Sequence, residues 1–174
     1  VVMFSGGLGS WEAAKLRRAP HPARRMELVF ADVRFEDEDL YRFLPEAAAN
    51  VGAPLTVTAD GRDIWKVFLD ERYLGNTRAD PCSKILKRRH LRRWLEANHD
   101  PARTTVVLGF GPEEGTRVAE ALPHWAPWDV AFPLHEVGMG EAEVRAWLDR
   151  EGVDLPRLYE YGFSHNNCRG GCVK

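Results

Sequence analysis

The strongest constraint on the fold of this chain is a regular alternation of short apolar runs with segments of helical periodicity. Strand-like runs are expected at residues 1–4, 27–31, 55–58, 104–110 and 129–134. Helical segments are expected at residues 11–18, 38–51, 62–71, 82–98, 112–122 and 141–151. Strands separated by helices favour a parallel sheet that is covered on both faces. Right-handed crossovers then predict a Rossmann-like α/β fold, with a doubly wound, mainly parallel, five-stranded sheet.

This topology also predicts where a ligand would bind. In doubly wound sheets, ligands lie beyond the carboxyl ends of the strands. Four segments follow strands directly: the glycine-rich loop at residues 5–10, Asp32, Asp60 and residues 109–114. We therefore expect these segments to line one edge of the sheet.

Composition narrows the class of protein. The 174 residues are 44% hydrophobic, which supports a packed core and argues against disorder. The formal net charge of −2 excludes nucleic-acid binding through overall positive charge, so any such role would need a local patch. No apolar run approaches the roughly 18 residues that cross a bilayer, and the start VVMFSGG lacks a basic signal-peptide region. Three cysteines, an odd number, favour a reducing, cytoplasmic setting over a disulfide scaffold.

The loop Ser5-Gly6-Gly7-Leu8-Gly9-Ser10 lies between the first strand and the first helix. Glycines let backbone N–H groups approach an anion closely, and the start of a helix adds positive dipole. A Walker A loop would require a Lys, which is absent, and in a dinucleotide fingerprint Glu12 would stand at the third Gly. The remaining pattern, SGGxxS, predicts a phosphate-binding loop. A plain strand-to-helix turn is the alternative.

SGGxxS resembles the SGGxDS loop of the PP-loop ATP pyrophosphatases, with Gly9 at the position of the Asp. Further segments resemble this superfamily, and its PAPS reductase-like branch, in the same order along the chain: LVFAD (28–32), NTRADPCSKILK (76–87), GFGPEEGTR (109–117) and GFSHNNCRGGCVK (162–174). The resemblance implies a HUP-type nucleotide-binding domain at residues 1–161. A Cys/Gly-rich tail at residues 162–174 would then pack on the active-site side.

The resemblance also implies an activity. The enzyme would bind ATP with Mg²⁺, join AMP to a substrate with release of pyrophosphate, and support sulfur transfer to a nucleotide-like acceptor. Two alternatives stay open: a thiol-dependent reductase of a PAPS or APS type sulfonucleotide, and a nucleotide-binding module without turnover. The implied partners are a nucleotide, a small-molecule, nucleobase or RNA acceptor, a sulfur-donor protein and a second copy of the chain, with no membrane partner.

Residue roles follow from the loop and from the resemblance. We expect nucleotide contacts from Ser5, Gly6, Gly7, Gly9, Ser10, Asp32, Lys87, Arg88 and Gly109. The expected catalytic side chains are Cys82, Lys84, Glu114 and Arg117, where Glu114 would hold Mg²⁺ or orient Arg117.

The helix expected at residues 82–98 is strongly basic. At about 100° per residue, Lys84, Lys87 and Arg88 share the sector that becomes apolar toward the end of the helix. This pattern predicts that the basic end overhangs phosphates; the alternative is a solvated face whose Lys stems cover apolar surface. Solvent exposure is expected for Arg89, Arg92 and Arg93, with a small nucleic-acid footprint as the alternative.

Cys82, Cys168 and Cys172 are expected to converge beside the nucleotide cleft. Three cysteines resemble the ligand set of PP-loop enzymes that hold a [4Fe–4S] cluster. Zinc bound by the same cysteines with His165, a persulfide relay, and idle thiols are the alternatives. Two further expectations concern packing: a solvated acidic helix start at residues 36–39, and core positions for Trp125, Trp128 and Trp147.

Overall fold

The computed structural model describes residues 1–75 and 79–171 of the chain. Its centre is a five-stranded sheet in the order β3-β2-β1-β4-β5, in which all neighbouring strands are parallel. The strands are β1 (Val2–Met3), β2 (Leu28–Ala31), β3 (Leu55–Thr58), β4 (Thr105–Val107) and β5 (Asp129–Ala131). The predicted doubly wound α/β fold is therefore confirmed, and the sheet is entirely parallel rather than mainly so.

The helices alternate with the strands along the chain. They are α1 (Leu8–Arg18), α2 (Glu38–Val51), α3 (Ile64–Glu71), α4 (His90–Asn98), α5 (Gly115–Trp125), α6 (Pro133–Val137), α7 (Glu141–Arg150) and α8 (Arg157–Glu160). A π-helical stretch (Ser83–Arg89) leads directly into α4, and short 3₁₀ turns occupy Pro101–Arg103 and Cys168–Gly170. Within the described residues, no helix is long and apolar enough to cross a membrane.

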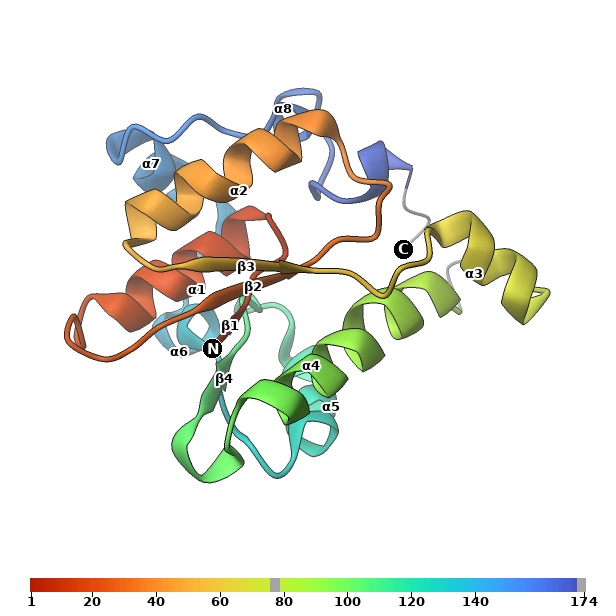
Figure 1. Cartoon of the computed structure of the whole chain (residues 1–174). Helices are drawn as coiled ribbons and strands as arrows, with labels where there is room; N and C mark the ends of the chain where they lie inside the picture. The colour runs from red at the N-terminus through yellow and green to blue at the C-terminus, as the bar shows by residue number, and fades with distance from the viewer. Residues whose placement is uncertain (76–78, 172–174) are drawn as a thin grey trace.

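Strand alternation divides the core into two layers. Val2, Leu28 and Phe30 point to the face that is covered by α1, α2 and α7, whereas Met3 and Val29 point to the face covered by α4 and α5. Figure 1 shows α2 and α7 above the sheet and α4 and α5 below it. Trp125 and Trp128 are buried in the second layer, and Trp147 packs against the first, as expected from the sequence.

The strand order fixes the place of the ligand edge. The chain runs from β1 outward to β2 and β3, and then returns to the other side of β1 with β4 and β5. The direction therefore reverses between β1 and β4, which is where open α/β sheets bind their ligands. The glycine loop follows β1 and Gly109 follows β4, so both lie at this switch point.

Several element boundaries differ from the predicted ones. The last strand ends at Ala131 rather than at residue 134, because Pro133 starts the short helix α6. Neither α6 nor α8 was predicted. The single helix expected at residues 82–98 has a π-helical first half, with i→i+5 hydrogen bonds. A π-helix turns by less than the roughly 100° per residue of an α-helix. The predicted common face of Lys84, Lys87 and Arg88 therefore does not hold in this stretch.

Candidate nucleotide site

The glycine loop is organised by the Ser10 hydroxyl. This oxygen accepts hydrogen bonds from the Ser5 N–H and the Ser5 hydroxyl, both at 3.2 Å, and donates to the Gly7 carbonyl at 2.8 Å. Gly6 has a φ of +74°, a conformation that strongly favours glycine. Neither Gly6 nor Gly7 donates a backbone hydrogen bond to any described residue. The loop therefore offers free N–H donors ahead of α1, as an anion site requires.

Gly9 lies where two backbones meet. A Cβ atom at Gly9 would come within 2.9 Å of the Gly109 carbonyl oxygen. The reverse contact is tighter, since a Cβ at Gly109 would lie 2.3 Å from the Gly9 oxygen. The start of α1 thus packs directly on the end of β4, and this close approach is a physical reason for glycine at position 9.

A cavity of about 220 Å³ opens at this switch point. Its lining includes Leu8 and Gly9 from the glycine loop, Gly109 from the end of β4, and three carboxylates. The carboxylates are those of Glu113, Glu114 and Glu141.

Glu114 and Arg117, both predicted to be catalytic, are joined to each other at this cavity. One Glu114 oxygen is ion-paired with Arg117, and the other accepts the Gly111 N–H at 2.8 Å. The Arg117 guanidinium also lies over the Phe110 ring, 4.2 Å from its centroid. Of the two predicted roles for Glu114, this geometry favours orienting Arg117.

The C-terminal segment contacts the glycine loop directly. The Leu8 N–H donates to the Tyr159 hydroxyl at 3.3 Å, and the side-chain amide of Asn166 donates to the Gly6 carbonyl at 3.1 Å. Asn166 is only 1% exposed. Sequence reasoning assigned a role to neither residue: Tyr159 lies in no motif, and in the tail segment 162–174 only the cysteines and His165 were singled out. Only the fold brings Tyr159 and Asn166 to a loop about 150 positions away.

The acidic run at residues 36–39 is not the solvated helix start that the sequence suggested. The Glu36 side chain is fully buried. It accepts a hydrogen bond from Lys87 at 3.0 Å and another from the backbone N–H of Cys168, while the Glu36 carbonyl accepts from Arg169. A buried carboxylate is stable only when it is paired in this way. In the sequence, the only indication that Glu36 has a special role is its position just after β2.

Asp37 and Asp39 continue this contact with the C-terminal segment. Arg157 pairs with Asp37 at 2.8 Å, and the Arg157 N–H donates to Asp39 at 2.8 Å. Burial opposes ionisation of Asp37, but hydrogen bonds from Arg157 and from the Asp39 N–H lower its pKa. The pKa of Asp39 is also lowered, mainly by its hydrogen bond from Arg42. We call residues 36–39 the acidic clamp.

The predicted basic residues separate in space. Lys87 points to Glu36 and also donates to the Asn167 side chain at 3.2 Å. Arg88 makes a two-point contact with Asp80, at 3.0 and 3.1 Å, and Lys84 is exposed. The π-helical geometry of this stretch explains why the three do not form the common sector that was predicted. Within the described part of the tail, Lys87 is the one of these three residues that contacts it, and Asn166 next to its partner Asn167 contacts the glycine loop.

Asp32 follows β2 and is held by its neighbours. One carboxylate oxygen accepts the Tyr41 hydroxyl and the Arg34 N–H, both at 2.7 Å. Burial, together with this hydrogen bond to Asp32, raises the pKa of Tyr41. The role of Asp32 beside the adenosine stays a prediction.

Two of the three cysteines, Cys82 and Cys168, lie against the same part of the core. Cys82 and Cys168 both pack against one small apolar cluster, whose members are Val33, Ile64, Val67, Ile85 and Leu86. In Figure 1 the turn at Cys168–Gly170 lies between the start of α2 and α3. Cys172 and residues 76–78 lie outside the described residues. Within the described part, no three His, Cys, Asp or Glu side chains are grouped as metal ligands.

Comparison with known proteins identifies the fold. No family model matches this chain, and no curated protein matches it. Its structure is similar to the crystal structure of phosphoadenylyl-sulfate (PAPS) reductase from Candida auris in a phosphate complex. The TM-score is 0.61 at 15% sequence identity, and the match covers 95% of this chain and 80% of that chain. The chain therefore has a PAPS reductase-like fold, as the order of its motifs predicted.

Proposed function

We propose that this chain is an enzyme that binds an adenine nucleotide at the glycine loop and reduces a sulfonucleotide with thiols. The observation that carries this proposal is the tie between the loop and the cysteine-bearing tail. Asn166 donates to the Gly6 carbonyl, and two residues later the backbone of Cys168 is held by buried Glu36. A phosphate bound by the Gly6 and Gly7 N–H groups would therefore lie close to the segment that carries a thiol.

The redox balance defines what the thiols must do. Sulfur in a sulfonucleotide is at oxidation state +6, and in sulfite it is at +4, so each turnover consumes two electrons. Two thiols supply these electrons. The bond between the nucleotide oxygen and the SO₃⁻ group breaks, and one disulfide forms. The nucleotide oxygen and the sulfite each take up one of the two thiol protons. We assign the first thiol to Cys168 and the second to Cys82 or an added dithiol. The backbone of Cys168 is held beside the ion pair of Glu36 and Lys87, which fixes where this residue lies relative to the glycine loop.

The test is sulfite release from PAPS by reduced protein with dithiothreitol. Cys168→Ser should abolish sulfite formation, and Gly7→Val should abolish it by blocking phosphate approach. Cys168→Ser should still bind the nucleotide. Full activity of Cys168→Ser, or no sulfite under any condition despite nucleotide binding, would contradict the reductase proposal.

The second candidate is ATP-dependent adenylation, which the three glutamates at the cavity favour. Carboxylate oxygens suit Mg²⁺, and Glu113 and Glu141 would hold it beside a triphosphate. Mg²⁺ would supply charge neutralisation of the phosphates. This candidate predicts exchange of labelled pyrophosphate into ATP that requires Mg²⁺ and is lost in Glu113→Gln. Mg²⁺-independent nucleotide binding without exchange would leave the reductase as the supported reaction.

An iron–sulfur cluster fits the chain only in part. Cys82 and Cys168 share one apolar cluster, which would provide two thiolate ligands, and the third predicted ligand, Cys172, lies outside the described residues. A cluster would supply electron transfer or hold sulfur. Iron content and visible absorption of anaerobically purified protein test for it directly.

A further inference from the structure

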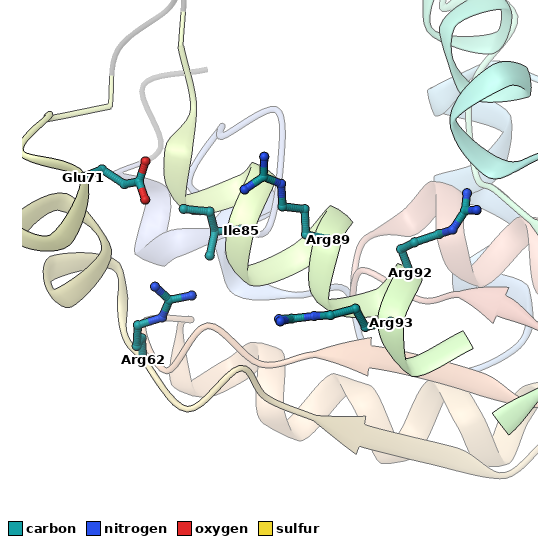
Figure 2. Close-up of a pocket in the computed structure, with 6 residues that line it drawn as sticks. All are labelled: Arg62, Glu71, Ile85, Arg89, Arg92 and Arg93. Carbon is teal, nitrogen blue, oxygen red and sulfur yellow. The ribbon is translucent and has the colours of Figure 1, made fainter. Parts of the chain in front are cut away.

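We infer that an arginine-lined pocket beyond β3 binds phosphate oxyanions, either of a free nucleotide or of a nucleic-acid strand. The pocket measures about 390 Å³ and shares no lining residue with the cavity at the glycine loop. Figure 2 shows its walls: Arg62 and Glu71 at the two ends of the α3 region, and Ile85, Arg89 and Arg93 from the π-helical stretch and α4. It is thus a separate site on the same ligand edge of the sheet.

Asp60 fixes two of the arginines. Its side chain is 7% exposed and accepts hydrogen bonds from Arg62 at 2.6 Å and from Arg93 at 3.0 Å. The hydrogen bond from Arg62 lowers the pKa of Asp60 despite burial. Figure 2 shows the Arg62 and Arg93 side chains extending toward each other from opposite walls. One carboxylate therefore orients two guanidinium groups, and each of them keeps further N–H donors.

The charge of the pocket is incompletely compensated by the protein. Arg89 has no ion-pair partner among the described residues, and the Arg93 side chain is 64% exposed. Arg92 also lines the pocket, but its guanidinium turns away to the carbonyls of His124 and Ala126 and does not contribute charge there. Among the described residues, Glu71 is the only carboxylate that lines the pocket, and behind the lining Asp60 pairs with Arg62 and Arg93, while Asp70 pairs with Arg62 and Lys66. Four positive side chains thus face three carboxylates, and the excess is positive in a chain whose net charge is −2.

The chemistry of the walls suits a phosphate that is attached to a ribose or a base. The planar guanidinium fork matches phosphate oxygens in a two-point geometry, and Arg89 and Arg93 are one helical turn apart on the same wall. Ile85 and the aliphatic stems of the arginines provide apolar surface for a ribose or a base. A volume of about 390 Å³ is within the range of small-ligand sites, which starts at roughly 300 Å³.

The experiment measures binding of two probes, inorganic pyrophosphate and a fluorescent single-stranded decathymidylate, at low salt. The variants are Arg89→Gln and Arg93→Gln, singly and together, because Arg62 remains to pair with Asp60. The double variant should bind at least about tenfold more weakly, as loss of two charged hydrogen-bonding groups requires. Arg150→Gln, on the exposed end of α7, is the matched control and should bind like the original chain.

The two probes separate the sources of phosphate. If the double arginine variant loses oligonucleotide binding, and its remaining affinity depends less on salt, the ligand of the pocket is a nucleic-acid strand. Loss of pyrophosphate binding alone identifies a free phosphate ligand. Gly7→Val distinguishes this site from the proposed catalytic one, since it should leave binding in the pocket intact. Binding that is lost in Gly7→Val but kept in the double arginine variant would overturn the inference, as would no binding of either probe.

Discussion

At the scale of single residues, Glu12 is the least expected feature. It lies in the second turn of α1, is completely buried, and neither carboxylate oxygen has a hydrogen-bond partner among the described residues. Burial, with a smaller effect of Glu143, raises the pKa of Glu12 to about 7. An ionised carboxylate in this position is costly, so the protonated acid is the form that the fold tolerates.

Stability should therefore fall as the pH rises. The folded-state pKa of Glu12 lies above its unfolded value of 4.5, so the folded chain binds more protons between about pH 4.5 and 7. The free energy of unfolding therefore falls by about 3 kcal/mol in total as the pH rises from about 4.5 to about 7, and changes little above that range. Glu12→Gln should remove this pH dependence, whereas the exposed Glu120→Gln should not. Urea unfolding at about pH 4.5 and about pH 8 measures it; parallel pH profiles for Glu12→Gln and the original chain would contradict the assignment.

A second prediction concerns the close contact of Gly9 with Gly109. Gly9→Ala places a Cβ 2.9 Å from a backbone oxygen, which cannot move as easily as a side chain can. We expect a destabilisation of about 1–3 kcal/mol, typical of overpacking. Gly140→Ala is the matched control, because a Cβ there meets its nearest neighbour only at 3.9 Å. Equal unfolding free energies for the two variants would show that the glycine loop can retreat from β4.

At the scale of elements, the acidic clamp connects the start of α2 to the C-terminal segment. Glu36 holds Cys168 and Lys87, while Asp37 and Asp39 hold the start of α8 through Arg157. Short helices and irregular tails have little stability of their own, so their position depends on such contacts. The clamp therefore determines where Asn166 and Cys168 stand relative to the glycine loop.

Arg157→Ala should release this segment without unfolding the sheet. Amide hydrogens at residues 157–168 should exchange several times faster, while those of β1, β2 and β4 keep their protection. Arg150→Ala, an exposed arginine without an ion pair among the described residues, serves as the control. Native hydrogen exchange measures the effect, and unchanged exchange of the C-terminal segment would show that apolar packing alone holds it.

At the scale of the whole molecule, the switch point gathers segments from both halves of the chain. The glycine loop comes from the first half, Gly109 and the glutamates come from the second, and the tail contacts the loop from the C-terminal end. A ligand that bridges these parts binds only the folded chain and must therefore stabilise it.

Adenine nucleotide should raise the melting temperature. At a concentration about 100 times Kd the stabilisation is about 2.7 kcal/mol, which corresponds to a shift of about 5 to 10 °C for a chain of this size. The shift should vanish in Gly7→Val and persist in Arg89→Gln. Thermal unfolding with ATP, with and without Mg²⁺, and with PAPS provides the measurement. An equal shift in Gly7→Val would place the nucleotide elsewhere.

The sequence by itself determined the architecture of this protein. Apolar runs of strand length, separated by helical periodicities, leave few alternatives to a parallel sheet covered on both faces. In a parallel sheet the carboxyl ends of all strands lie at the same edge. The SGGxxS loop after the first strand therefore lies at the same edge as the segments that follow the other strands. These features depend on residues that are close together in the chain, and local periodicity reports them reliably.

Only the tertiary structure decided which side chains meet. Glu36 looked like part of a solvated helix start, yet it is buried, because the tail returns over it after 130 residues. The predicted basic sector of Lys84, Lys87 and Arg88 was wrong, because the π-helical turn changes the direction of each side chain. No pattern in the sequence indicates a π-helical turn there. Gly9, Tyr159 and Asn166 acquire their roles from close approaches between distant segments. Such contacts depend on how elements pack in three dimensions, which the periodicity of one segment does not encode.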